Sequence, residues 1–161
     1  MTTDATTTPV TTSIDVDVDV ERAFAVFTEG IGSWWNPDHH IIQAPFDHMV
    51  FEPRVGGHIY DVGVDGSECR WATVLVYDPP RRVVFSWNIT LQWTLETDPD
   101  RTSEVEVTFE PRDGGGTRVT LSHGQLQRHG DGWENMRDSV GSDGGWPSGL
   151  RLFAERAGVT A

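Results

Sequence analysis

Alternation of apolar and polar residues runs through most of this chain and constrains its fold more than any other feature. Over residues 13–18, Ile and Val occupy every second position and aspartates stand between them. Such a period of two predicts a β-strand with one buried face and one solvent-facing side. The same pattern recurs over 70–77, 83–90, 104–110 and 117–123. The sequence therefore predicts a fold dominated by an antiparallel sheet.

Turn signals separate these strands at short intervals. The Gly56-Gly57 pair predicts a hairpin between strands over 49–55 and 57–62. Glycines at 114–116 predict another turn between the last two strands. The count is one first strand and about six further strands, with no internal repeat and no linker.

Two helical segments flank the strands. Asp19 stands at a position suited to an N-cap, and the apolar residues that follow it are spaced for one helical face, which predicts one or two short helices before residue 34. At the other end, 146–157 carries Leu150, Phe153 and Ala157 on one stripe. An apolar sheet face needs a cover, and only this last helix is long enough to supply it. Residues 125–145 are polar and give no strand pattern.

The composition narrows the class of protein. A chain of 161 residues is long enough for one domain with a real core. The net charge is −13 and all twelve basic residues are arginine, which disfavours nucleic acid and anionic membranes as partners. The threonine-rich residues 1–12 are expected to form a disordered leader before a single domain over 13–158, and they lack a secretory signal. With Cys69 as the single cysteine, we expect a cytoplasmic protein without an internal disulfide.

The motifs, taken in order, resemble the SRPBCC or START-like (helix-grip) superfamily, and within it the branch similar to the activator of the heat-shock-protein-90 ATPase. The matching segments extend over roughly residues 14–158 and read VERAFAVFT with GIGSWWNP, FEPRVGGHIYD, DGSECRWATVLVYDPPRRVVFSW, EVEVTFEPRDGGGTRVTLSH and GGWPSGLRLFAERAG. The resemblance implies an α+β fold: a curved antiparallel sheet of about seven strands wrapped around a long C-terminal helix, with two short helices after the first strand. It leaves the function open, because the superfamily includes lipid carriers, hormone receptors, cyclases and co-chaperones.

A curved sheet closed by one helix tends to leave an internal cavity, which is the predicted binding site for a small, largely apolar molecule. Indole side chains are the predicted walls, since they suit a flat or apolar ligand. The segment GSWWNPDHHII (32–42) is expected to close one end of the cavity. The predicted wall residues are Trp35, Trp71, Trp87 and Trp146.

Strand parity selects the polar candidates. Asp61 shares a face with Ile59 and is predicted to point inward, where a carboxylate needs a partner. Arg70 is its predicted partner; the equal alternative is that a bulge shifts the parity and leaves Asp61 solvated. His123 shares parity with neighbouring apolar residues, so a satisfied core histidine is favoured over a catalytic base. The resemblance adds His40, because similar proteins tend to have a histidine soon after the Trp pair.

Three histidines near the Trp pair are candidate metal ligands. His39, His40 and His48 lie near Asp47 in the sequence. Adjacent histidines on an extended segment point to opposite sides, and no helical ligand spacing is present. We therefore expect no metal and no cofactor.

Three functions remain open. The favoured one is ligand binding, with Asp61, Arg70 and His40 or His123 orienting the ligand. The first rival is a cyclase-like or hydrolase-like enzyme that uses His40 or His123 with Asp61 as an acid–base pair. These two differ in whether a cavity carboxylate and a histidine come within hydrogen-bond reach. The second rival, a chaperone accessory protein, rests on the resemblance, and a homodimer remains open.

Overall fold

The computed structural model describes residues 9–36 and 39–158. Seven strands form one sheet in the order β1-β7-β6-β5-β4-β3-β2, and every neighbouring pair is antiparallel. The elements, in chain order, are β1 (Val10–Val16), α1 (Val20–Phe27), η2 (Ile31–Ser33), β2 (Phe46–Phe51), β3 (His58–Gly63), β4 (Glu68–Asp78), β5 (Arg82–Trp87), η3 (Pro99–Arg101), β6 (Ser103–Pro111), β7 (Thr117–Gly124), η4 (Leu126–His129), α2 (Trp133–Val140) and α3 (Trp146–Ala157).

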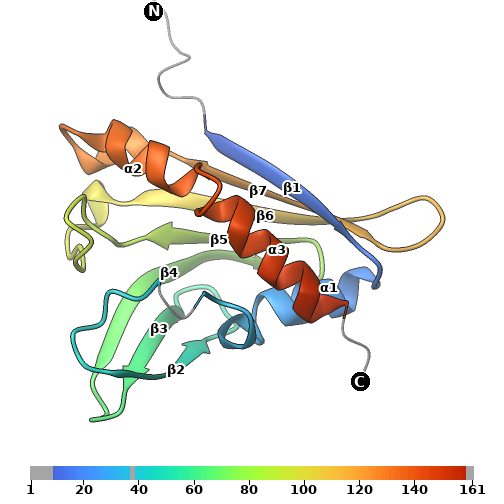
Figure 1. The fold of residues 1–161 in the computed structure, drawn as a ribbon, viewed down its shortest axis with the longest axis horizontal. Helices are drawn as coiled ribbons and strands as arrows, with labels where there is room; N and C mark the ends of the chain where they lie inside the picture. Colours follow the sequence, from blue (N-terminus) through green and yellow to red (C-terminus); the bar gives the residue numbers. More distant parts are fainter. Residues whose placement is uncertain (1–8, 37–38, 159–161) are drawn as a thin grey trace, which may run out of the picture.

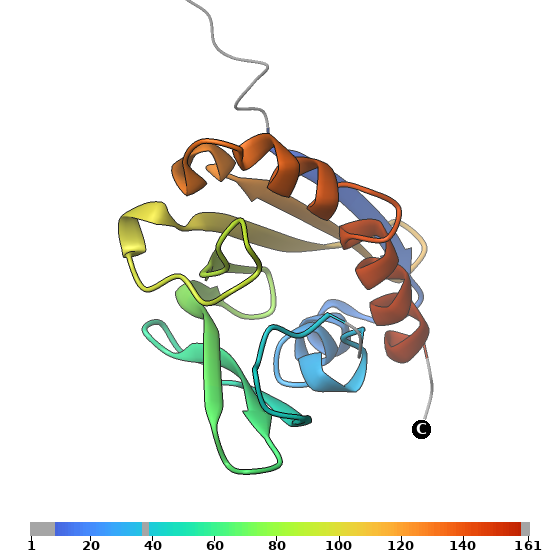
Figure 2. The same cartoon turned by 60° about the vertical axis from the view of Figure 1, so that its left-hand side comes forward.

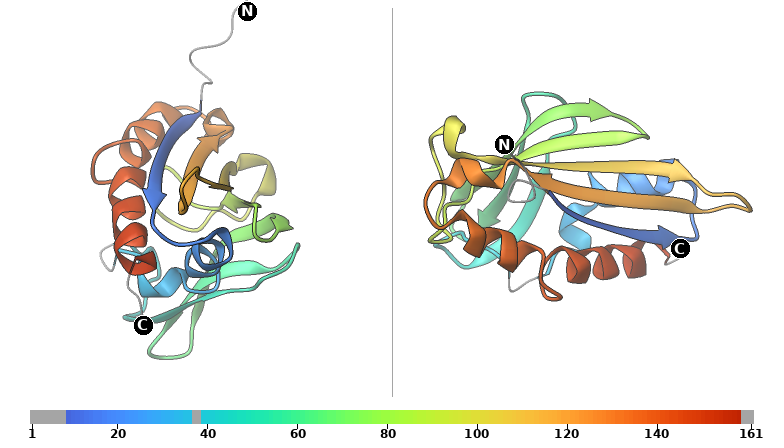
Figure 3. Two further views of the ribbon diagram at one scale, coloured as in Figure 1. Left: turned by 90° about the vertical axis from the view of Figure 1, so that its right-hand side faces the viewer. Right: turned by 90° about the horizontal axis from the view of Figure 1, so that it is seen from above.

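The sheet is strongly curved, and the helices lie on its concave side. Figure 1 shows α3 crossing in front of the strands, and Figure 2 shows how the sheet bends around the space beside it. Seen from above in Figure 3, α2 and α3 lie together on one side of β1, β6 and β7. The predicted helix-grip architecture, an α+β fold with a curved seven-stranded antiparallel sheet, is confirmed.

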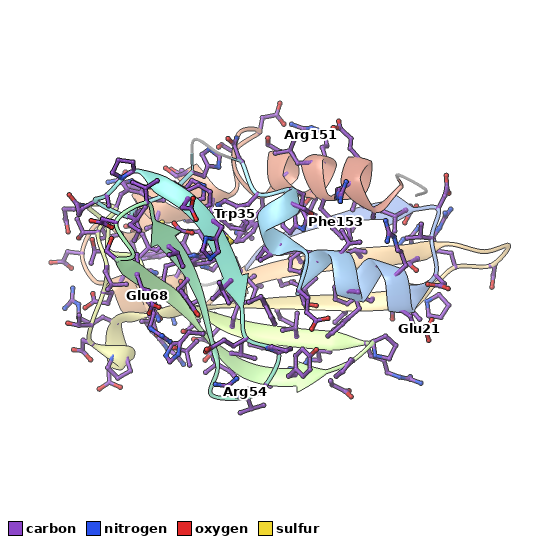
Figure 4. The ribbon with its side chains drawn as sticks, turned by 90° about the horizontal axis from the view of Figure 1, so that it is seen from below. Glu21, Trp35, Arg54, Glu68, Arg151 and Phe153 are labelled. Atoms are coloured by element: carbon purple, nitrogen blue, oxygen red, sulfur yellow. The ribbon has the colours of Figure 1, made fainter. Side chains whose placement is uncertain are left out.

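Aromatic side chains form the core between α1, α3 and the sheet. The side chain of Asp19 caps α1 by accepting a hydrogen bond from the backbone N–H of Arg22, as expected from the sequence. The ring of Phe153, on α3, lies 5.4 Å from the ring of Phe27 on α1. Figure 4 shows Arg151 on the outer side of the same helix, so the predicted stripe is the face that α3 buries.

The first strand begins earlier than expected. Val10 already pairs with His123 on β7, so the predicted leader over 1–12 is wrong for its last three residues. The two threonines at 11 and 12 continue the alternating exposure of β1, and threonine is a favourable strand residue. The predicted leader's residues 1–8 lie outside the described part of the chain.

A helix that the sequence did not predict, α2, lies within the polar segment 125–145. Only Met136 and Val140 are buried among its eight residues, so its apolar stripe is short. Its N-cap is Gly132, which offers no side-chain oxygen, so the usual start signal is missing. Within the described residues, no helix combines the length and apolar character that crossing a lipid bilayer requires.

Candidate functional site: a tryptophan-lined pocket

A pocket of about 520 Å³ lies between the loop after α1, strands β3 to β5 and the junction of α2 and α3. Its volume is in the range of pockets that hold drug-sized molecules. Most of the lining is aromatic or aliphatic, with a few polar groups between. The lining residues are Trp34, Trp35, Asn36, His39, His40, Ile41, Asp61, Trp71, Trp87, Ile89, Trp93, Ser139, Val140, Ser142, Gly144, Gly145, Trp146 and Gly149.

Four indoles form a closed set of contacts in the pocket wall, which we call the tryptophan cluster: Trp35, Trp71, Trp87 and Trp146. Ring centroids lie 5.0 Å apart between Trp35 and Trp71, and 5.8 Å apart between Trp71 and Trp87. Trp146 closes the set at 5.5 Å from Trp87 and 5.8 Å from Trp35. All four predicted wall residues therefore line one pocket, and tilted or edge contacts hold their ring planes in place.

Asp61 and His40 form the polar corner of this pocket. The carboxylate oxygen Oδ2 of Asp61 lies 2.9 Å from Nδ1 of His40, and Asp61 is only 1% exposed. The imidazole also stacks on the ring of Phe46 at 3.8 Å between centroids. A carboxylate that accepts this hydrogen bond takes it from Nδ1 of His40, which in a neutral imidazole leaves the lone pair on Nε2. A pocket carboxylate and a histidine are therefore within hydrogen-bond reach, which is the feature that the sequence analysis expected of an enzyme.

The predicted Asp61–Arg70 pair is wrong. Arg70 points to the opposite side of the sheet, where its Nη2 donates to Glu68 at 2.8 Å and its guanidinium lies over the ring of Tyr60. Its side chain is 42% exposed, so Arg70 does not reach the pocket.

A bulge in β4 is the physical reason. Ile59 of β3 pairs with Ala72 of β4, but Asp61 pairs with Cys69, so three residues of β4 advance against two of β3. The inward parity therefore changes between Trp71 and Ala72, which are both buried, and Arg70 falls on the outer face. The alternative prediction was a bulge that leaves Asp61 in contact with solvent. The bulge is present, but Asp61 is buried.

His123 is a satisfied core histidine, as favoured over a catalytic base, but it is not among the residues that line the pocket, so the structure does not place it where it was predicted to orient a ligand. The indole Nε1–H of Trp146 donates to its Nδ1 at 3.0 Å. Its Nε2–H must then donate to Ser103 Oγ, whose hydroxyl donates to Nε2 of His129, both at 2.7 Å. Burial, and then the nearby His129, lower the pKa of His123 to about 3, so it stays neutral. By accepting the hydrogen bond from Trp146, His123 holds that indole in the pocket wall.

The remaining metal candidates are scattered. His39 is exposed, and His48 pairs with its neighbour Asp47 at 2.6 Å on the surface. Over residues 9–36 and 39–158, no group of three or more His, Cys, Asp or Glu side chains is arranged to hold a metal ion. Burial, followed by the charge of Asp61, raises the pKa of Cys69 to about 11, which keeps it a neutral thiol.

Several lining residues were not predicted. Trp34 is a core residue whose Nε1 donates to the Val26 carbonyl, and it is also among the residues that line the pocket. Trp93 lines the pocket with 44% of its surface exposed and a left-handed backbone, φ 62°. Ser139 lies in the last turn of α2, which carried no sequence signal, and Ser142 follows the end of that helix. Richness in tryptophan was the one signal that pointed to Trp93.

Solved structures similar to this chain share its fold. An anthrahydroquino-γ-pyrone synthase, Txn09, is 40% identical, with a TM-score of 0.64 over 92% of this chain and 96% of that one. CalC of Micromonospora echinospora, described as a self-sacrificing resistance protein, is 29% identical, with a TM-score of 0.66 over 93% and 94%. Protein Ms6760 of Mycobacterium smegmatis, 20% identical with a TM-score of 0.65 over 98% and 95%, supports the fold alone.

The comparison with families agrees with the structure. No curated protein sequence is significantly similar to this chain. The profile of the family described as "Activator of Hsp90 ATPase homolog 1-like protein" matches residues 17–158, which is most of the chain and nearly all of the described fold. The chain belongs to this family, within the helix-grip superfamily.

Proposed function

We propose that this protein is a cavity enzyme that binds a planar, multi-ring molecule and closes a further ring in it by proton transfer. The observation that carries the proposal is the His40–Asp61 pair, 2.9 Å apart at the wall of the tryptophan-lined pocket. A histidine held by a buried carboxylate is a usual arrangement for a general base. The sequence alone favours binding without catalysis, whereas the His40–Asp61 pair favours an enzyme.

The walls of the pocket favour a flat ligand. Trp35, Trp71, Trp87 and Trp146 present faces and edges of indoles to the pocket. Flat aromatic ligands gain both area burial and ring contacts from such walls. The pocket's few polar groups would then fix the orientation of the ligand.

The similarity to Txn09 supports the class of reaction. That protein's name describes a synthase of a pyrone ring joined to an anthrahydroquinone, and it is 40% identical over nearly the whole chain. A pyrone contains a ring oxygen between two carbons, so its formation needs a new carbon–oxygen bond. We infer that this chain acts on a related class of molecule, a hydroxylated multi-ring aromatic compound.

The geometry supplies the proton transfers of such a ring closure. Nε2 of His40 accepts the proton of a ligand hydroxyl, and the hydroxyl oxygen then bonds to an electrophilic carbonyl carbon of the same molecule. The proton passes from His40 to the former carbonyl oxygen, so no atom is gained or lost. Loss of water from this adduct completes an unsaturated ring. Asp61 stabilises the imidazolium that forms in between, through the Nδ1–H hydrogen bond. No oxidant or reductant is required.

A model reaction tests the proposal. 1-(1-Hydroxynaphthalen-2-yl)butane-1,3-dione closes to a fused γ-pyrone with loss of water, which is followed by absorbance and chromatography. We expect the protein to accelerate this closure, and His40→Gln to lower kcat by about 10²-fold or more while tryptophan quenching still reports binding. His48→Gln is the matched control, because His48 is exposed and is not among the described residues that line the pocket. No acceleration over buffer, or a fully active His40→Gln variant, refutes the proposal.

The alternative is binding without catalysis, which the 29% identity with CalC supports, since that protein's description is of resistance and not of synthesis. Saturable quenching with no turnover of any hydroxylated ring compound would favour this alternative. A chaperone partnership rests on the family's description alone, and a shared fold does not fix function.

A further inference from the structure

One oxygen of the buried carboxylate in the pocket has no partner. Oδ2 of Asp61 bonds to His40, but Oδ1 has no hydrogen-bond partner among the described residues. The residue is 1% exposed and lines the pocket. A buried carboxylate oxygen without a partner is costly, so this atom is suited to accept a hydrogen bond from a molecule in the pocket.

A second unpartnered group lies in the same wall, and it is a donor. Nε1 of Trp87 has no acceptor among the described residues, although Trp87 is only 5% exposed. Three other indoles of the pocket are different: Trp34, Trp35 and Trp146 donate to the Val26 carbonyl, the His39 carbonyl and Nδ1 of His123. Buried indole N–H groups usually find a partner, so Trp87 is the exception that needs a cause.

The two groups stand apart across the sheet. Asp61 lies on β3 and Trp87 on β5, with β4 between them. Two strand spacings therefore separate their backbones, about 10 Å. Trp71 of β4 lies between them in sheet order and also lines the pocket, with its ring 5.8 Å from that of Trp87. A ligand that reaches both groups lies over Trp71 and is extended.

We infer that the pocket selects a neutral, extended aromatic molecule with a hydroxyl group at one end, donating to Oδ1 of Asp61, and a carbonyl group toward the other, accepting from Nε1 of Trp87. This inference deepens the proposed function and rests on its binding pocket, but not on its catalytic step. An anionic ligand is disfavoured, because Asp61 is acidic and the described residues that line the pocket include no arginine.

A set of four probes of nearly equal shape separates the two contacts. 4′-Hydroxyflavone carries both groups, flavone only the carbonyl, 4-(naphthalen-2-yl)phenol only the hydroxyl, and 2-phenylnaphthalene neither. Dissociation constants come from quenching of tryptophan fluorescence near pH 7, where the phenols are neutral. We expect 4′-hydroxyflavone to bind tightest, and the loss of either group to weaken binding about 3–10-fold, the usual value of one neutral hydrogen bond.

Variants assign each contact to its residue. Trp87→Phe keeps an aromatic ring and removes the donor, so flavone should lose its advantage over 2-phenylnaphthalene. Asp61→Asn keeps an oxygen for His40 and can present an amide N–H₂ in place of Oδ1. We expect 4′-methoxyflavone to bind the unmodified protein more weakly than 4′-hydroxyflavone, and to bind Asp61→Asn equally well. Trp35→Phe is the matched control, because its N–H already bonds to the His39 carbonyl, and it should weaken all probes by a similar factor.

The outcomes are distinct. If the four probes bind the unmodified protein equally, the inference is overturned and the proposed pocket survives. If none of them binds, the pocket's proposed role is overturned as well. A hydroxyl preference that persists in Asp61→Asn, or a carbonyl preference that persists in Trp87→Phe, overturns that residue's assignment. The ligand series on the unmodified protein decides the selectivity even if a variant does not fold.

Discussion

At the scale of single residues, the most informative group outside the pocket is His123. Its hydrogen bonds form a directed chain in which Trp146 donates to His123, His123 to Ser103, and Ser103 to His129. The indole donor sets the direction of the whole chain, because it has no acceptor of its own. Protonating His123 would place two donors face to face at Nδ1, so the chain requires a neutral imidazole.

This requirement predicts a pH dependence of stability. The pKa of His123 is about 3 in the folded protein, against about 6.5 in the unfolded chain. Between these values only the unfolded chain takes up the proton, so the free energy of unfolding falls as the pH falls from 6.5 toward 3. The contribution is about 1.4 kcal/mol per pH unit, and the lowered pKa of His129 acts in the same direction.

Urea denaturation at pH 7, 6 and 5 measures this slope. His123→Gln should be less stable at pH 7 but show a shallower decline, since it lacks the titrating group. His39→Gln, at an exposed histidine, should keep the original slope. Equal slopes in His123→Gln and the unmodified protein would contradict the assignment.

At the scale of elements, α3 is anchored by one aromatic side chain. Phe153 is fully buried, and its ring lies 5.4 Å from Phe27 and 5.6 Å from Trp34. Phe153→Ala should therefore lower the free energy of unfolding by about 3–5 kcal/mol, because a large core side chain is lost and a cavity remains. Glu155→Ala, on the exposed face of the same helix, should change it by less than about 0.5 kcal/mol. A loss below this limit for Phe153→Ala, measured by denaturation, would be incompatible with the packing of α3.

The junction of α2 and α3 depends on one glycine. A Cβ atom on Gly145 would lie 2.3 Å from the carbonyl oxygen of Val140 and 2.5 Å from that of Ser139, which are backbone atoms and cannot yield by side-chain rotation. Gly145→Ala should destabilise the fold by about 1–3 kcal/mol, as overpacking does. It should also weaken the binding of ligands in the pocket, because Ser139, Val140 and Gly145 line it.

The neighbouring residue provides the control for this junction. A Cβ atom on Gly144 meets nothing within 4 Å, so Gly144→Ala should leave the free energy of unfolding nearly unchanged. Denaturation of the two variants makes the comparison, because Gly144 itself lines the pocket and its effect on binding is not a control. Equal effects of the two substitutions would show that the close backbone approach at Gly145 is not what shapes the junction.

The elements also show what a sequence reveals. Five of the strands and helix α3 carry clear periodicity, and a turn signal predicted the hairpin of the other two strands, so their existence and order followed from pattern and from the family resemblance. Helix α2 did not, because two buried residues and a glycine cap give no periodic signal. The bulge near Trp71 also gave no sequence signal, because an extra residue in β4 changes the parity of the strand without changing its composition. This change of parity is the reason that Arg70 was predicted on the wrong face. Asp61 was predicted correctly because the regular part of β3 kept its alternation.

At the scale of the whole molecule, the site exists because three distant parts of the chain meet. The pocket takes His40 from the loop after α1, Asp61 and the central tryptophans from the sheet, and Trp146 from the start of α3. The sequence could name most of these residues but not their pairing, which depends on tertiary contacts. The net charge of −13 and the pocket without arginine agree with one another, since both favour a neutral ligand over an anion.

Such a pocket links ligand binding to the stability of the entire fold. A ligand that contacts the loop, the sheet and the α2–α3 junction binds the folded chain and not the unfolded one. The free energy of unfolding should then rise by about 2.7 kcal/mol at a free ligand concentration of 100 times Kd. With 4′-hydroxyflavone as the probe, denaturation midpoints measured over a range of concentrations should follow the Kd obtained from fluorescence. Trp35→Phe, which we expect to weaken binding, should shift the whole curve to higher concentration by the same factor. If the concentration dependence of the stabilisation were the same in Trp35→Phe and the unmodified protein, the probe would bind outside the tryptophan pocket.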